Sequence, residues 1–252
     1  MRPAFGASWL RAADVSPPLW LLRFECAAAG TARKRKWAAA DGAGAEAAAG
    51  GGGPPLFVEV ERVFAAPTLA PLDALVAALD RTASREEVAG FKTASTEVIS
   101  RQLAPWLFPP LARAFLAADA RLRALPAGHS AFLTAVQYNR YDGEAGDHFD
   151  VFHTDEVESA TSYKELSLVV FLSEPNDFGG GAFQVRATED APPLSLRAPQ
   201  NSAVCFRARR LLHRVTPVTA GCRRSLVAWA TVRDVSRQYE PCWSFDSVLA
   251  QE

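Results

Sequence analysis

Short apolar segments separated by turn residues fill the second half of this 252-residue chain. Beyond Ser130 the helical spacing of apolar residues disappears, and runs typical of strands follow at 131–141, 166–173, 182–187, 194–198, 202–206 and 225–232. Turn signals such as Gly179-Gly180-Gly181 separate these runs. The segment 166–173 is apolar at odd and even positions alike, as expected for a strand buried on both faces. This half of the chain therefore predicts a β-sandwich or a β-barrel.

The preceding region carries the elements that would support such a core. Residues 57–64 have the composition of a first strand, and residues 71–82 fit a helix with proline in its first turn. A second helix is expected from about Pro110 to Leu125, because its leucines recur on one face. Helices followed by many short strands predict a mainly β fold with flanking helices.

The amino-terminal region has a different composition. Residues 27–55 are rich in Ala and Gly, which leaves little to bury and favours a linker. We therefore expect four regions along the chain. They are a variable N-terminal segment with an Ala/Gly-rich linker (1–55), a strand with supporting helices (56–130), a β core (131–235) and a C-terminal tail (236–252).

Composition excludes several classes of function. The formal net charge is −1, so no overall positive field attracts nucleic acid. No apolar run of about 18 residues is present, so we expect no membrane contact. The 4 cysteines form no Cys-x-x-Cys motif, which favours a reducing, intracellular compartment such as the cytoplasm. The basic run Arg33-Lys34-Arg35-Lys36 leaves nuclear targeting open, and an organellar leader is also open.

The histidines suggest a metal site. His148-Phe149-Asp150 places an imidazole and a carboxylate two residues apart, so both lie on one face of a strand. His213, the only later histidine, can supply a third ligand. Two imidazoles and one carboxylate are the ligand set that holds non-haem iron(II). Arg223 follows ten residues later and can pair with a carboxylate through two hydrogen bonds. His153-Thr154-Asp155 is a second His-x-Asp motif and the alternative to His148 and Asp150.

An ordered set of motifs lies between Tyr138 and Trp229. These motifs are Tyr138 with Gly143, His148-Phe149-Asp150, Phe171-Leu172-Ser173, Gly180-Gly181, His213-Arg214-Val215 and Gly221-Cys222-Arg223. The set resembles the catalytic domain of the prolyl 4-hydroxylase-type 2-oxoglutarate oxygenases, including the PKHD hydroxylases. The resemblance implies a double-stranded β-helix, a jelly-roll barrel of the cupin type. It also implies Fe(II) as cofactor, 2-oxoglutarate and O2 as cosubstrates, and ascorbate as a further cofactor. The implied reaction hydroxylates a C–H bond and releases succinate and CO2.

The resemblance also implies roles for single residues. His148, Asp150 and His213 would hold the iron, because His148 stands at the family's distance before the Leu172-Ser173 strand end, and Arg223 would bind 2-oxoglutarate. Tyr138 is the candidate phenol in the cosubstrate pocket. The residue after the Gly-Gly turn, usually acidic or Thr, is Ala182 here. His213 is expected in a loop that is rich in arginine, at Arg207, Arg209, Arg210 and Arg214.

The substrate stays open at this stage. A protein, with a prolyl side chain as one option, and a small molecule are both compatible with the resemblance. A nucleic-acid demethylase of the AlkB type is disfavoured, because position 229 holds Trp where that group has a second arginine. A catalytically silent β-helix that binds a partner or senses metal is the alternative from another class.

Overall fold

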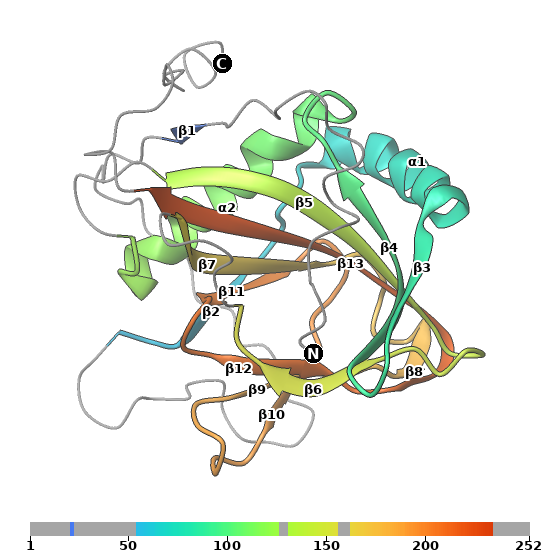
Figure 1. Cartoon of the computed structure of the whole chain (residues 1–252). Helices are drawn as coiled ribbons and strands as arrows, with labels where there is room; N and C mark the ends of the chain where they lie inside the picture. The colour runs from blue at the N-terminus through green and yellow to red at the C-terminus, as the bar shows by residue number, and fades with distance from the viewer. Residues whose placement is uncertain (1–20, 23–53, 126–130, 156–161, 234–252) are drawn as a thin grey trace.

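The structure is a computed structural model that describes residues 21–22, 54–125, 131–155 and 162–233. Two β-sheets face each other, and helices lie on the outer side of the larger sheet (Figure 1). In the described part of the chain every strand pair is antiparallel. The architecture is a double-stranded β-helix with flanking helices, as the sequence predicted.

The larger sheet has nine described strands. Its main path runs β2 (Phe57–Val60), β11 (Ala203–Arg207), β7 (Ser162–Phe171), β13 (Val218–Arg233), β5 (Ala131–Asp142), β4 (Lys92–Ile99) and β3 (Ser84–Val88). Two further strands, β1 (Leu21–Leu22) and β8 (Phe178–Gly180), pair with β5 and β13. The four-stranded sheet has the order β10 (Leu194–Leu196), β9 (Phe183–Arg186), β12 (Leu212–Val215) and β6 (Phe149–His153).

The larger sheet buries apolar side chains on both faces. One face packs against α1 (Ala66–Thr82), the short 3-10 helix η1 (Pro105–Leu107) and α2 (Phe108–Leu122). The other face packs against the smaller sheet. Strand β7 shows the division clearly, since Leu166 and Leu168 contact the helices while Val169 and Phe171 lie between the sheets. The prediction of a strand buried on both sides is confirmed.

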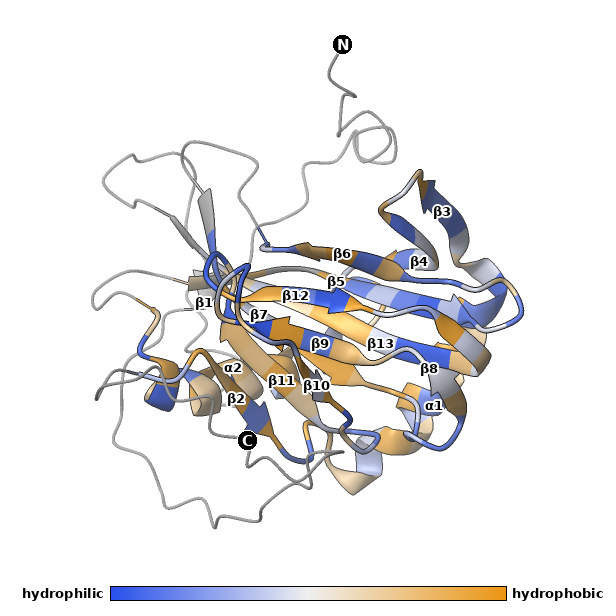
Figure 2. Cartoon of the chain, turned by 90° about the horizontal axis from the view of Figure 1, so that it is seen from below, coloured by the Kyte–Doolittle hydropathy of each residue, from blue (hydrophilic) through white to orange (hydrophobic). Residues whose placement is uncertain are grey.

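In β9 and β10 of the smaller sheet, hydrophobic and hydrophilic residues alternate (Figure 2). In β9, Phe183 and Val185 are buried, and Gln184 and Arg186 are half-buried on the other face. This period of two is the pattern of a sheet with one face in the core and the other toward water.

Several expected elements differ in extent. Strand β2 ends at Val60, before the predicted residue 64, and Arg62 beyond it has a φ of 53°. Helix α1 begins at Ala66 rather than at residue 71, with proline in its first turn. The hairpin of β3 and β4 was not predicted, because its residues are polar and owe their strand conformation to pairing with each other and with β5. His213 lies on strand β12, which corrects the expectation of a loop.

The Gly180-Gly181 turn is explained by close backbone packing. Gly180 has a φ of 66°, and a Cβ atom there would lie 2.2 Å from the carbonyl oxygen of Pro217. Only glycine avoids both problems at this position. The following residue, Ala182, donates its backbone N–H to the hydroxyl of Thr216 at 2.9 Å, so this turn is closed without an acidic side chain.

No helix in the described ranges is long and apolar enough to cross a membrane.

Candidate metal centre

Two histidines and one aspartate come together where β6 pairs with β12. The potential ligand atoms of His153, Asp155 and His213 all lie within 4.8 Å of one another. His153 and His213 are directly paired residues of the neighbouring strands β6 and β12, so their side chains leave the sheet side by side. Asp155 follows the end of β6, and its backbone N–H is held by the carbonyl of Ala208 at 2.9 Å.

Both imidazoles are oriented by their own strands. The Nδ1 atom of His153 donates to the carbonyl oxygen of Val151 at 2.9 Å, and Nδ1 of His213 donates to that of Leu211 at 3.2 Å. This hydrogen bond fixes the tautomer and leaves Nε2 with a lone pair for a metal ion. Burial, together with the nearby His213, lowers the pKa of His153 to about 4, so this imidazole is neutral at pH 7.

The carboxylate of Asp155 is held at one oxygen. Its Oδ2 atom accepts hydrogen bonds from the hydroxyl of Ser167 and from the indole N–H of Trp229, the latter at 3.0 Å. Burial raises the pKa of Asp155, but the nearby His213 and these hydrogen bonds outweigh it, and the net pKa is lowered. The group is therefore an oriented anion at neutral pH, with Oδ1 available to a cation. The ammonium group of Lys164 lies 4.2 Å from the centre of the Trp229 ring.

His148 and Asp150, the pair preferred from the sequence, do not join this cluster. His148 precedes β6 and forms a bridge with Thr93 of β4. Asp150 pairs with Arg214 at 3.3 Å, on the face of β12 opposite to His213. The structure thus assembles the alternative His-x-Asp motif, because the register of β6 against β12 sets His153 opposite His213.

Arg223 is buried in the same space between the sheets. Its side chain is 2% exposed, and its guanidinium carbon lies 5.4 Å from the Tyr141 ring and 5.7 Å from the Phe171 ring. The Nη1 atom has one long contact of 3.4 Å to Ser225, and Nη2 has no hydrogen-bond partner among the described residues. Burial lowers the pKa of Arg223. A buried guanidinium with an unused donor is suited to receive an anion.

Aromatic rings connect this arginine to the histidine cluster. Phe171, beside Arg223, lies 6.2 Å from Phe183, and Phe183 lies 5.8 Å from the His213 ring, measured between ring centres. A small pocket beside Arg223 is lined by Phe171, Phe183 and Gly181, among others. The guanidinium and the three potential metal ligands therefore face one apolar interior.

Tyr138 lies on the other face of β5. Its hydroxyl donates to Asp80 of α1, and its ring is fully buried among the residues that face the helices. The expected place of Tyr138 beside the cosubstrate is therefore not supported. Tyr141, three residues later and on the opposite face, is the tyrosine that contacts Arg223, and burial raises its pKa to about 12. The register of β13 against β5 places Tyr141 opposite Arg223, and the sequence alone does not give this register.

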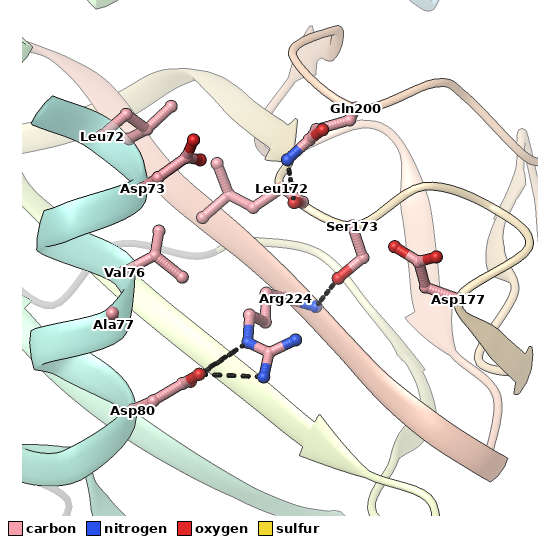
Figure 3. A pocket seen from close by; sticks show the side chains of 10 residues that line it. All are labelled: Leu72, Asp73, Val76, Ala77, Asp80, Leu172, Ser173, Asp177, Gln200 and Arg224. Atoms are coloured by element: carbon pink, nitrogen blue, oxygen red, sulfur yellow. Dashed lines mark hydrogen bonds and ion pairs between the residues drawn. The ribbon is translucent and has the colours of Figure 1, made fainter. Parts of the chain in front are cut away.

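A cavity of about 260 Å³ lies away from the histidine cluster. It opens between α1 and the end of the larger sheet, where Arg224 pairs with Asp80 at 2.8 Å (Figure 3). Two further polar side chains of its lining are engaged, since Ser173 accepts from the backbone of Arg224 and Gln200 donates to the carbonyl of Leu172. None of the residues that line this cavity belongs to the cluster of His153, Asp155 and His213.

The arginines near His213 are held by the fold. Arg207 donates to the last carbonyls of α2 at 2.6 and 2.9 Å. Arg209 pairs with Glu165 at 3.2 Å, and Arg214 pairs with Asp150. These contacts account for three of the four basic residues that the sequence singled out.

Known proteins resemble this chain in the region that holds these residues. Residues 136–231 match the model of the 2OG-Fe(II) oxygenase superfamily. A PKHD-type hydroxylase of Shewanella sp. strain ANA-3 is 37% identical over 145 residues, which are 52% of this chain and 62% of that protein. A PKHD-type hydroxylase of Hyphomonas neptunium is 34% identical over 107 residues, 40% of this chain and 46% of the relative. The chain thus spans about half the length of these relatives.

A solved structure shares the fold. The prolyl-4-hydroxylase of Pseudomonas putida superposes with a TM-score of 0.55 at 18% sequence identity, covering 71% of this chain and 92% of that one. This match covers more of the chain than residues 136–231 do.

Proposed function

We propose that the chain is an Fe(II)- and 2-oxoglutarate-dependent hydroxylase, because residues 136–231 match the model of the 2OG-Fe(II) oxygenase superfamily and the chain is similar to PKHD-type hydroxylases. We further propose that His153, Asp155 and His213 hold the iron. The observation that carries this assignment is their mutual approach within 4.8 Å, with both Nδ1 atoms engaged by carbonyls.

The donor set fits Fe(II). Two neutral imidazoles and one carboxylate are the ligands of non-haem iron(II) sites, which keep further positions open for substrates. Their net charge with Fe(II) would be +1, which suits an anionic, chelating cosubstrate. Among the described residues no other group of three or more His, Cys, Asp or Glu side chains has this proximity.

We propose that Arg223 binds the distal carboxylate of 2-oxoglutarate. The guanidinium is buried in an apolar interior, has an unused Nη2 donor and faces the same space as the metal ligands. A carboxylate there would accept hydrogen bonds from a charged donor that water does not reach. Tyr141, beside Arg223, would form a wall of this subsite.

When bound, Fe(II) and 2-oxoglutarate supply the oxidising chemistry, in which O2 is consumed, succinate and CO2 are released and a C–H bond is hydroxylated. The residues of this chain hold and orient these partners. Ser167 and Trp229 hold one oxygen of Asp155, and the aromatic side chains between Arg223 and His213 keep water out.

A peptidyl substrate, with a prolyl side chain as first candidate, is proposed by analogy with the P. putida prolyl-4-hydroxylase and the PKHD-type relatives. A small-molecule substrate is the second candidate. A nucleic-acid demethylase of the AlkB type is disfavoured, because those enzymes have an arginine where this chain has Trp229. The indole of Trp229 instead donates a hydrogen bond to Asp155. We also propose that ascorbate supports turnover as a reductant, and that the enzyme acts inside the cell.

The decisive experiment compares the two His-x-Asp motifs. His153→Ala should abolish iron binding, because it removes a metal ligand. It should therefore also abolish the production of succinate, both with and without a substrate to hydroxylate. His148→Ala should retain iron and activity, since His148 makes its bridge to Thr93 through the backbone. Bound iron, succinate and circular dichroism are measured on both purified variants. Loss of iron in His148→Ala, with iron retained in His153→Ala, would reverse the assignment of the metal ligands. A wild-type protein that produces no succinate would instead favour a catalytically silent binding domain.

A further inference from the structure

An aromatic ring lies flat against the proposed ligand His153. The ring centres of Phe149 and His153 are 4.0 Å apart, and the planes differ by only 13°. Residues four apart on a regular strand lie too far from each other for such contact, because each residue advances the strand by about 3.3 Å. Here the pairing of β6 with β12 is irregular. His213 pairs with His153 and Val215 pairs with Phe149, so four steps on β6 match two on β12.

Because of this irregularity, the side chain of His153 lacks the support that a regular β ladder gives. In a regular ladder, the pleat and both neighbouring strands fix the direction of a side chain. His153 is the last residue of β6 and lies at the bulge. The Phe149 ring contributes a flat surface that a regular neighbour would not provide, and stacking of this kind restricts the rotation of the imidazole.

The β3–β4 hairpin supports the stack from the other side. Phe91, in the turn between the two strands, lies edge-on to Phe149 at 4.8 Å and is 5.7 Å from His153. The turn is closed by a hydrogen bond of 2.9 Å from the N–H of Phe91 to the carbonyl of Val88. Phe149 is therefore enclosed between a fixed hairpin and the ligand.

Two contacts fix the hairpin itself. Lys92, only 7% exposed, pairs with Glu86 across the hairpin at 2.7 Å. Thr93 and His148 exchange two backbone hydrogen bonds of 2.8 and 2.9 Å, which join β4 to the start of β6. The first His-x-Asp motif thus has a structural position, since its histidine joins the hairpin to the strand that carries the ligand.

We propose that Phe149 is a positioning residue for His153, and that the β3–β4 hairpin maintains this position through Phe91. The inference depends on the proposed role of His153 in binding metal. With Nδ1 bonded to Val151 and the ring stacked on Phe149, both side-chain torsions of His153 are set before a metal arrives. Metal binding then costs less conformational entropy, and the Nε2 lone pair points in one direction.

Metal affinity without turnover tests the proposal. Co(II) is titrated anaerobically into the metal-free full-length protein, and its visible absorption gives both the dissociation constant and the coordination geometry. Phe149→Leu keeps an apolar side chain but removes the flat ring, and it should weaken Co(II) binding on the order of 10- to 100-fold, as loss of an outer contact to a ligand commonly does. Phe149→Tyr retains the ring and should bind within about threefold of the wild type.

A matched control lies on the same strand. Phe152 contacts Arg186 and Arg214 on the opposite face of β6, at 4.0 and 4.5 Å from its ring centre. Phe152→Leu makes the same chemical change without touching the stack, so Co(II) affinity should stay unchanged. Phe91→Ala leaves Phe149 in place and should have an intermediate effect. Circular dichroism of each metal-free variant checks the fold, and Phe91→Ala still tests the stack if Phe149→Leu does not fold.

The outcomes separate the inference from the function on which it depends. If His153→Ala binds Co(II) like the wild type, the proposed metal site fails. If His153→Ala loses the metal while Phe149→Leu and Phe91→Ala keep wild-type affinity and spectrum, only the positioning role fails. Equal weakening in Phe149→Leu and Phe152→Leu would likewise overturn it, because the effect would then reflect the strand as a whole.

Discussion

Arg223 and Arg224 are neighbours in sequence but lie on opposite faces of β13. Arg223 is buried between the two sheets, whereas Arg224 pairs with Asp80 of α1. The pairing with β5 places Arg223 opposite Tyr141 and Arg224 opposite Arg140, so the strand register alone separates the two roles. The same alternation places Tyr138 with Arg224 and Asp80, away from the proposed cosubstrate subsite.

This separation predicts different effects of the two arginines. Arg223→Ala should raise the KM for 2-oxoglutarate by tens- to thousands-fold, because truncation of one partner of a buried charge pair costs about 2–5 kcal/mol. Iron affinity should change little. Arg223→Lys should be intermediate, since an ammonium group cannot form two parallel hydrogen bonds.

Arg224→Ala is the control in the same assay. It should leave the KM for 2-oxoglutarate nearly unchanged, because its contacts are with α1 on the other face. Steady-state kinetics and anaerobic binding of 2-oxoglutarate measure both variants. If the KM for 2-oxoglutarate rises in Arg224→Ala and not in Arg223→Ala, then Arg224 binds the cosubstrate and the proposed role of Arg223 is wrong.

At the scale of elements, one carboxylate joins α1 to the larger sheet. Asp80 accepts hydrogen bonds from Arg224 (Figure 3). It also accepts one from Tyr138, and Nε of Arg140 lies 3.8 Å from its Oδ1 atom. Burial raises the pKa of Asp80, but these partners outweigh burial and the net pKa is lowered. Helix α1 has a modest apolar contact, with Leu72 and Leu79 as its buried residues, so this polar contact fixes its position on the sheet.

A lowered pKa in the folded state gives a stability that depends on pH. Asp80 binds a proton more readily in the unfolded chain than in the folded protein. Its contribution to the free energy of unfolding is therefore fully present above a pH of about 4, the pKa of an unfolded aspartate. The contribution is lost as the pH falls through the lower pKa of Asp80 in the folded protein. Asp80→Asn should lower the free energy of unfolding by about 1 kcal/mol at pH 7, because the pair is partly exposed. The substitution should also make the fall in the free energy of unfolding toward acidic pH less steep.

Urea unfolding of the wild type and the variant at neutral and acidic pH measures this effect. Asp73→Asn changes an exposed carboxylate that lines the same cavity, so it serves as the matched control and should leave both quantities unchanged. An acid-side decline of stability that is identical in Asp80→Asn and in the wild type would show that other carboxyl groups produce it.

At the scale of the whole molecule, the larger sheet belongs to two apolar cores. One core lies between this sheet and the helices, and the other lies between the two sheets. The strands of the larger sheet come from both the supporting region and the β core, since β2 pairs with β11, and β4 pairs with β5. Strands from both sides of the expected boundary near residue 130 thus pair in one sheet of the described chain. The helices and both sheets should unfold together.

A shortened chain beginning at Pro55 tests the role of the N-terminal segment. It retains all described elements except β1, which pairs with β5 through only Leu21 and Leu22. We expect it to fold and to consume 2-oxoglutarate at a rate similar to that of the full chain. Thermal unfolding and succinate release are the measurements, and failure of this chain to fold would show that the segment before residue 55 packs on the core.

A second truncation beginning at Ala65 provides the contrast. It removes β2, whose Phe57 and Val58 are 8% and 5% exposed, and it leaves β11 as a free edge. Burial of each such side chain contributes about 1.5–3 kcal/mol, so this chain should be destabilised by several kcal/mol. Equal stability of the two shortened chains would show that β2 adds nothing to the fold.

The sequence by itself determined the features that depend on local pattern. Alternation and turn residues predicted the strands of the core, and the doubly apolar segment 166–173 predicted a strand buried on both sides. Spacing of chemically distinctive residues predicted His213 and Arg223 as members of one site. These inferences need only the period of a strand and the chemistry of a side chain, which neighbouring residues already specify.

Only the tertiary structure decided between residues that are equivalent in local pattern. Two His-x-Asp motifs stand five residues apart, and the strand pairing sets His153, rather than His148, opposite His213. Tyr138 and Tyr141 share one strand, but only Tyr141 has the parity that faces Arg223. A bulge shifts register by whole residues, and its position depends on the partner strand far along the chain. Local sequence therefore could not choose between them.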